Sequence, residues 1–118
     1  MPSPILIAST DIDRRLLVMT VDGPLVDPDH LEALRLVVPA VPAGHSLIVD
    51  VSGVSGFSHE AIAALRSVAR DAVETGQTFV VVCSDLDRRT DLVLADLDTL
   101  VPVVAAVEQA IPFTSTAA

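Results

Sequence analysis

Short apolar runs and longer periodic stretches alternate along this chain, which is the pattern of strands interleaved with helices. Five short runs, each bounded by polar residues or by glycine and proline, predict β-strands. These strands are expected at 5–8, 16–21, 47–51, 78–82 and 101–104. The polar stretch 9–15 predicts an antiparallel turn between the first two strands, and Asp22-Gly23-Pro24 is expected to end the second strand.

The stretches between these runs carry helix signals. Asp27 as the N-cap and Pro28 as the first helical residue predict a helix over 27–41. A second helix is expected from an apolar stripe that ends before a capping glycine, Gly76. The stripe consists of Ala61, Ile62, Leu65, Val68, Ala69, Ala72 and Val73.

Two further helices are expected toward the C-terminus. Ser84-Asp85-Leu86-Asp87 resembles a capping box, and it opens a helix that is expected to point apolar side chains inward. These side chains are Leu86, Val93, Leu94 and Leu97. A last helix is expected at 105–111, and 112–118 is expected to be a frayed tail. The small-residue segment 52–58 is predicted to be a loop.

The resulting order of elements, β-β-α-β-α-β-α-β-α, predicts an α/β fold. Strand–helix–strand units form right-handed parallel crossovers, and the opening pair of strands adds an antiparallel element. We therefore expect a single mixed β-sheet of about five strands with about four helices packed on it. The whole chain, 1–118, is expected to be one domain with its core over about 5–111.

Composition narrows the classes of partner. The chain has 16 Asp and Glu residues and 7 basic residues, all of them arginine, for a formal net charge of −9. A basic surface for nucleic acid or for an anionic membrane is therefore not expected. No signal peptide and no membrane-spanning apolar run is apparent, which favours a cytoplasmic protein. The single cysteine, Cys83, excludes an internal disulfide and is expected to be a buried small hydrophobe.

No arrangement of polar residues meets the requirements of a common catalytic site. Asp50 ends a predicted strand, as a receiver-domain phosphoacceptor does, but the lysine that receivers need is missing, so Asp50 is expected to hydrogen-bond loop backbone. Ser58-His59-Glu60 has the residue types of a hydrolase triad, but adjacent helical residues point about 100° apart. The histidines His30, His45 and His59 are too scattered for a zinc site and are expected at the surface. We therefore predict no enzyme activity and no cofactor.

The start of the second helix is the most informative segment. Ser58 is predicted to be the N-cap, and Glu60 falls in the first turn. Free N–H groups and the positive end of the helix dipole can hold an anion or a phosphorylated side chain at such a place. The simpler interpretation is that Glu60 is a favourable first-turn acid.

The segment 50–62, Asp-Val-Ser-Gly-Val-Ser-Gly-Phe-Ser-His-Glu-Ala-Ile, resembles the signature of STAS domains, the anti-sigma factor antagonist family. Later segments resemble the same family in the same order: 76–83 its next strand, 88–98 the helix after it, and 103–111 its final strand and helix. The segment 23–27 is a looser match to the family's Gly-x-Leu-Asp. The resemblance covers about 20–111, and it implies the STAS fold and a regulatory role.

The resemblance also implies where the family's regulation falls in this chain. In the family, the second serine of an Asp-Ser-Ser motif is phosphorylated by an anti-sigma factor that is also a kinase, and the phosphate breaks the complex. Aligned without a gap, that serine is Glu60, the first serine is His59 and the aspartate is Ser58. Glutamate carries about −1 charge where phosphoserine carries about −1.5 to −2. The chain therefore resembles either a form that permanently mimics the phosphorylated protein or a domain that is no longer regulated by a kinase.

We predict a non-enzymatic regulatory module that binds a protein, such as an anti-sigma factor or kinase or a signalling assembly. The partner-binding residues are expected to be Asp27, Ser55, Gly56, Ser58, His59 and Glu60. A small-ligand domain that binds a nucleotide or a lipid is the alternative. A homodimer is also considered, because Leu36 and Leu92 lie off the main apolar stripes of their helices and are expected to be exposed.

Overall fold

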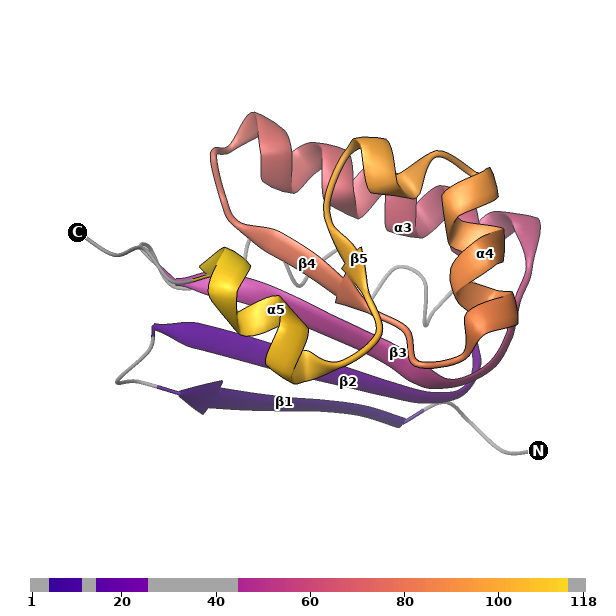
Figure 1. Cartoon of the computed structure of the whole chain (residues 1–118), viewed down its shortest axis with the longest axis horizontal. Helices are drawn as coiled ribbons and strands as arrows, with labels where there is room; N and C mark the ends of the chain where they lie inside the picture. The colour runs from indigo at the N-terminus through magenta and orange to yellow at the C-terminus, as the bar shows by residue number, and fades with distance from the viewer. Residues whose placement is uncertain (1–4, 12–14, 26–44, 115–118) are drawn as a thin grey trace.

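A computed structural model describes residues 5–11, 15–25 and 45–114, and within them the side chains of 15–22, 45–54 and 58–112. The helix expected over 27–41 lies outside the described residues, together with Asp27, His30 and Leu36. The described elements form a layered structure in which helices lie against a β-sheet (Figure 1).

Five strands form one sheet in the order β1-β2-β3-β4-β5. β1 pairs antiparallel with β2, whereas β2, β3, β4 and β5 pair with one another in parallel. The strands are β1 (Ile5–Asp11), β2 (Leu16–Leu25), β3 (Ser46–Phe57), β4 (Phe79–Val82) and β5 (Val103–Val104). The predicted mixed sheet with an antiparallel opening pair is confirmed.

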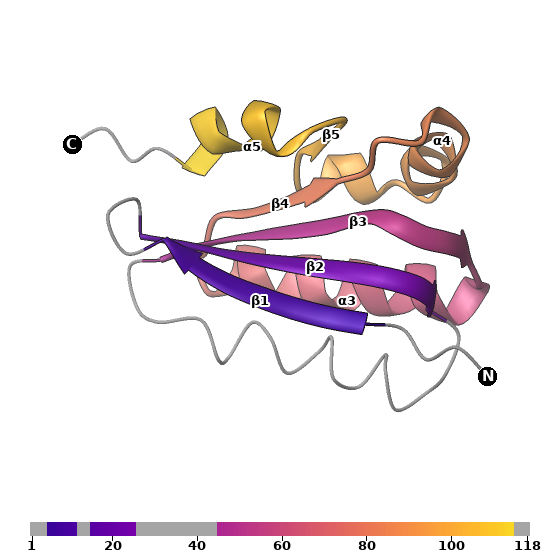
Figure 2. The same cartoon turned by 90° about the horizontal axis from the view of Figure 1, so that it is seen from below.

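Helices lie on both faces of this sheet. The described helices are α3 (His59–Glu74), α4 (Leu86–Leu94), the short 3-10 helix η1 (Leu97–Thr99) and α5 (Val107–Thr114). α3 runs along one face of the sheet and α5 lies on the other (Figure 2). This arrangement confirms the predicted α/β fold. No helix in the described part of the chain is both long and apolar enough to cross a lipid bilayer.

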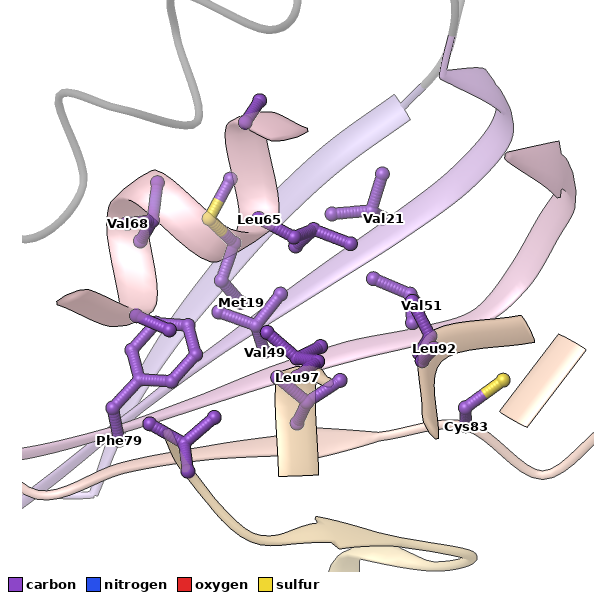
Figure 3. Packing of buried hydrophobic residues seen from close by; sticks show 14 of the residues in the cluster. Met19, Val21, Val49, Val51, Leu65, Val68, Phe79, Cys83, Leu92 and Leu97 are labelled. Atoms are coloured by element: carbon purple, nitrogen blue, oxygen red, sulfur yellow. The ribbon is translucent and has the colours of Figure 1, made fainter. Parts of the chain in front are cut away.

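Successive side chains of a strand point to opposite faces of the sheet, so the buried apolar residues form two clusters, one on each face. The larger cluster lies on the α3 face, where Val49 and Val51 of β3 meet Leu65 and other apolar residues of α3 (Figure 3). The smaller cluster lies on the α5 face, where Ile48 of β3 meets Ala110 of α5. β3 is therefore a central strand covered on both sides, which explains why its first half is an almost continuous apolar run.

The predicted loop at 52–58 is wrong, because β3 continues through most of this segment. Its extension pairs with β2, so the turn signal at 22–24 does not end β2 either. Val54 is fully buried. The ladder shifts register twice here, as in a β-bulge, and a side chain at Gly53 would collide with the carboxylate of Asp22. The absence of a side chain at Gly53 therefore leaves room for the Asp22 side chain of the neighbouring strand.

Most residues of the predicted apolar stripe of α3 are buried, but the last of them is exposed. Its buried residues are Ala61, Ala64, Leu65, Val68, Ala69 and Ala72. Val73, which was expected inside, is 52% exposed, because the buried sector of the helix is narrower than predicted. The helix ends in a Schellman motif: the N–H of Gly76 donates to the carbonyl of Val73 (3.1 Å), and that of Gln77 donates to the carbonyl of Ala72 (2.8 Å). The predicted glycine cap is confirmed.

α4 is rotated relative to the prediction. Leu86 and Leu94, which were expected inside, are 66% and 77% exposed, and Val93 is 42% exposed. Leu92, which was expected at the surface, is fully buried. The cause is the end of the helix at Leu94: the chain turns at Asp96, whose φ is 63°, before it reaches the next apolar residue. Residues after this turn do not continue the helical stripe, so the spacing used in the prediction does not apply.

α5 extends beyond its predicted end. It continues through Pro112 to Thr114, so the first part of the expected tail is helical. A proline removes only one backbone donor, and here it falls in the final part of a short helix, where few hydrogen bonds depend on it. Residues 115–118 lie outside the described residues.

Asp96 is a position where glycine is expected to stabilise the protein. Its φ of 63° lies in the left-handed region, and its side chain makes no capping hydrogen bond. Asp96→Gly is expected to raise the free energy of unfolding by about 0.5–1 kcal/mol, measured by urea denaturation. Asp98→Gly, in the 3-10 helix that follows, is the control and is expected to give no gain. An equal gain at both positions would contradict the explanation.

Candidate functional site

β3 and β4 are parallel neighbours, and Val82 at the end of β4 is paired with Asp50, so β3 extends beyond β4 before it ends at Phe57. β3 leads through Ser58 directly into α3, and β4 leads through 83–85 into α4. Both views place the start of α3 and helix α4 at the same end of the molecule (Figures 1 and 2). We call this region, formed by 52–60 and 83–89, the strand-end surface.

The start of α3 has the geometry that the sequence predicts. Ser58 is the N-cap, with extended backbone angles, and its Oγ accepts a hydrogen bond from the N–H of Ala61 at 3.0 Å. A cap of this kind contributes about 1 kcal/mol to stability. His59 and Glu60 follow in the first turn, and both are exposed. The Glu60 carboxylate therefore stands at the positive end of the helix dipole and is open to a partner.

Five of the six predicted partner-binding residues, Ser55, Gly56, Ser58, His59 and Glu60, are neighbours in sequence and lie in the described part of the chain. Ser55 and Gly56 lie in the last part of β3, immediately before Ser58. Asp27 lies outside the described residues, so its predicted place at the surface is not tested. The described residues of the set therefore form one continuous segment that passes from a paired strand into a capped helix.

Several interactions of the strand-end surface were not predicted. The N–H of Ser84 donates to the Oγ of Ser52 at 2.9 Å, which joins the start of the α4 connection to the extension of β3. The N-cap of α4 is Asp85, whose Oδ1 accepts from the N–H of Arg88 at 3.1 Å. The N-cap is therefore one residue later than the predicted capping box implies. The signal available in the sequence was the parallel order of the two strands, which places the end of β4 beside β3.

The basic side chains of α4 are bound to neighbouring groups. Arg88 forms a salt bridge with Asp85, with Nη1 3.2 Å from Oδ2. Arg89 Nη1 donates to the carbonyl oxygen of Cys83 at 3.1 Å. Arg89 therefore ties α4 to the residue that follows β4, whereas the salt bridge between Arg88 and Asp85 lies within the first turn of α4.

The other candidate chemistries find little support in the geometry. Asp50 Oδ1 accepts a hydrogen bond from the N–H of Ser52 at 2.9 Å, which confirms its predicted role with nearby backbone. His59 is exposed as predicted, whereas His45 is half-buried because it immediately precedes the buried start of β3. Across the described residues, no three His, Cys, Asp or Glu side chains gather in a way that could hold a metal ion.

Cys83 is fully buried, as predicted, and its thiol donates to the carbonyl of Asp85 at 3.7 Å. Burial raises the pKa of the Cys83 thiol above its ordinary value, and the nearby negative charge of Asp85 acts in the same direction. The thiol is therefore the neutral, unreactive form of cysteine at neutral pH.

The raised pKa of Cys83 predicts a loss of stability at alkaline pH. Between the pKa of the unfolded thiol and that of the folded thiol, the unfolded chain binds fewer protons, so the free energy of unfolding falls as pH rises above about 9. The chain has no tyrosine and its basic residues are all arginine, so Cys83 is the one side chain that titrates there. Urea denaturation between pH 8 and about 10.5 measures the slope. Cys83→Ala should remove it, and equal slopes for the two proteins would contradict the assignment.

The fold is that of known STAS domains. RsbS from Moorella thermoacetica, in a form with one serine replaced by glutamate, matches with a TM-score of 0.76 and 16% identity over 92% of this chain and 93% of that chain. An anti-sigma factor antagonist from Mycobacterium paratuberculosis matches with a TM-score of 0.72 and 21% identity over 93% of this chain and 92% of that chain. An anti-sigma factor antagonist (STAS) domain protein from Planctomyces limnophilus matches with a TM-score of 0.70 and 14% identity over 93% of this chain and 98% of that chain.

These comparisons confirm a STAS-like domain, the class that the sequence resemblance implied. No protein-family profile matches the chain. No curated protein matches it in sequence either. The likeness therefore lies in the fold, since identities of this size leave most side chains different.

Proposed function

We propose that this chain is a non-enzymatic regulatory domain that binds a protein partner, as an anti-sigma factor antagonist does, through the strand-end surface. The observation that carries the proposal is the position of Glu60. Its carboxylate is exposed in the first turn of α3, directly after β3, in a STAS-like fold. The resemblance of 50–62 to the STAS signature implies that Glu60 stands where the family has its regulatory serine.

The proposal includes the loss of the usual phosphorylation switch. Glu60 lies in the first turn of α3, where the helix dipole favours an acidic side chain. The neighbouring hydroxyl of Ser58 caps the helix, and its Oγ already accepts from the N–H of Ala61. Glu60 therefore supplies a lasting negative charge at a position where a kinase would add one only by phosphorylating a serine.

Charge reversal on α3 tests the proposed surface. The wild-type chain, Glu60→Lys and the control Glu74→Lys are used to capture proteins from extracts of the native organism. Both substitutions reverse one exposed glutamate of the same helix, but Glu74 lies at its far end. We expect a protein that wild type and Glu74→Lys retain and that Glu60→Lys binds at least tenfold more weakly, which is about 1.4 kcal/mol. Equal capture by all three proteins would contradict the proposed surface.

Phosphorylation is tested on the same complex. The captured protein is incubated with the wild-type chain, Mg²⁺ and ATP, and the chain is then analysed by mass spectrometry. We expect no phosphate on Ser55 or Ser58. Stoichiometric phosphate on either serine would contradict the proposal that Glu60 replaces the switch. A rise of the melting temperature with nucleotide alone would instead favour a small-ligand domain.

A further inference from the structure

The two edge strands of the sheet are built differently. β5 is only 2 residues long, whereas β1, at the other edge, pairs with β2 over the 7 residues Ile5–Asp11. Natural edge strands are kept from pairing with other chains by short length, charged residues, proline or a bulge. β1 contains no proline, its ladder with β2 has no register shift, and its only charged residue is Asp11 at its end. β1 therefore lacks most of the usual protections.

The backbone groups of β1 that point away from β2 follow from the strand pairing. The N–H of Ser46 donates to the carbonyl of Arg15 at 2.8 Å, so the odd-numbered residues among 16–22 direct their backbone groups toward β3. The even-numbered residues there face β1 and are paired with its odd-numbered residues, Ile5, Ile7, Ser9 and Asp11. The even-numbered residues of β1 therefore direct their N–H and C=O groups outward. These are Leu6, Ala8 and Thr10.

No strand in the described part of the chain pairs with this outer edge. Among residues 5–11, 15–25 and 45–114, β2 is the one strand that is hydrogen-bonded to β1. Figure 1 shows β1 as the outermost strand of the sheet. A row of N–H and C=O groups along a regular edge strand is a template for another extended backbone. The outer edge of β1 therefore fits a further β-strand.

A second copy of β1 fits this edge in an antiparallel register. When the two strands are related by a two-fold axis at Ala8, Ala8 lies opposite its own copy and Leu6 lies opposite Thr10 of the second copy. Every outward N–H and C=O group of both strands then has a partner, and the pairs with β2 are unchanged. Asp11 lies opposite Ile5 of the second copy, so like charges do not face each other.

The charge distribution also favours a second copy at this edge. The chain has a formal net charge of −9, so most contacts between two copies bring acidic residues together. The first ten residues contain no charged residue, and they include all of β1 except Asp11. Two acidic chains can therefore meet along β1 with little direct repulsion.

We propose that two copies of this chain form a dimer by antiparallel pairing of their β1 strands, centred on Ala8. The pairing joins the two sheets into one continuous sheet. The two-fold axis reverses the strand direction, so the strand-end surfaces of the two copies lie at opposite ends of the dimer. The dimer is independent of the proposed function, since its contacts include no residue of the strand-end surface.

Sedimentation velocity of the full chain at rising concentration tests the dimer. We expect the mass to rise from 12.4 kDa toward twice that value, with a dissociation constant below about 100 μM. Added salt should tighten the dimer, because it screens the repulsion between two acidic chains. Ala8→Pro removes an outward N–H that β2 does not use, and it should weaken the dimer at least tenfold. A chain that stays monomeric at high salt, or a folded Ala8→Pro that dimerises as wild type does, would overturn the proposal.

Disulfide formation tests the register without disrupting the strand. In a Cys83→Ala background, Ala8→Cys places two thiols across the two-fold axis, where Cα atoms lie about 5.5 Å apart, within the range that a disulfide spans. Thr10→Cys is the control, because its two copies would lie roughly 14 Å apart. We expect mild oxidation to cross-link Ala8→Cys at least tenfold more than Thr10→Cys. Equal yields at the two positions, or a dimer that neither position cross-links, would overturn the proposed pairing.

Discussion

Leu92→Ala is expected to lower the free energy of unfolding by about 2–5 kcal/mol, whereas Leu94→Ala should change it by less than about 0.5 kcal/mol. The two leucines lie two residues apart on α4, but Leu92 is fully buried and Leu94 is 77% exposed. Leu92 packs in the larger core cluster with Val51 and Leu97 (Figure 3). Urea denaturation of both variants at neutral pH measures the difference.

The variants of Leu92 and Leu94 also test which orientation of α4 is correct, the one in the structure or the one predicted from the sequence. The sequence predicts that Leu94 faces the core and Leu92 the solvent, and the structure reverses both. A larger loss for Leu94→Ala would therefore contradict the orientation of α4. It would also contradict the exposure of Leu86, Val93 and Leu94, since that exposure depends on the same orientation of α4.

Val54→Asp is expected to abolish cooperative folding, or to lower the free energy of unfolding by more than about 3 kcal/mol. Val54 is fully buried in the extension of β3, so the substitution places an unpaired carboxylate among apolar side chains. Circular dichroism on heating measures the loss of the cooperative transition. The result also bears on the site, because the start of α3 follows directly from this strand.

Val73→Asp is the control for Val54→Asp. It makes the same chemical change at a residue that is 52% exposed, and it is expected to cost less than about 1 kcal/mol. A stable, cooperatively folding Val54→Asp protein would show that 52–58 is a loop, as the sequence predicted. It would also mean that α3, whose first turn carries Glu60, follows a loop rather than a strand.

Much of the fold could be predicted from local pattern. The runs at 47–51 and 78–82 are nearly continuous in apolar residues because β3 and β4 are covered on both faces, and this pattern predicts both strands. Ser58 and Gly76 mark the two ends of α3, because a hydroxyl acceptor and a left-handed residue satisfy helix ends locally. These features depend on neighbours in sequence.

The candidate site was predicted only in part. The exposed position of Glu60 follows from the cap at Ser58, since the two residues lie in one helical turn. The bond between Ser52 and Ser84 joins residues far apart in the sequence, and it arises only when β3 and β4 pair. The exposure of Leu86, Val93 and Leu94 on α4 was not predicted, because the helical period was extended past the turn at Asp96.

The sequence by itself determined the order of elements, the central strands and the capped start of α3, because short-range hydrophobic patterning and capping control these features. Only the tertiary structure decided the strand extension at Val54 and the rotation of α4. The segment after Val51 continues as a strand because it pairs with β2. Leu92 is buried instead of Leu94 because its side of α4 packs against the core. Both outcomes follow from contacts between distant segments, which no local pattern contains.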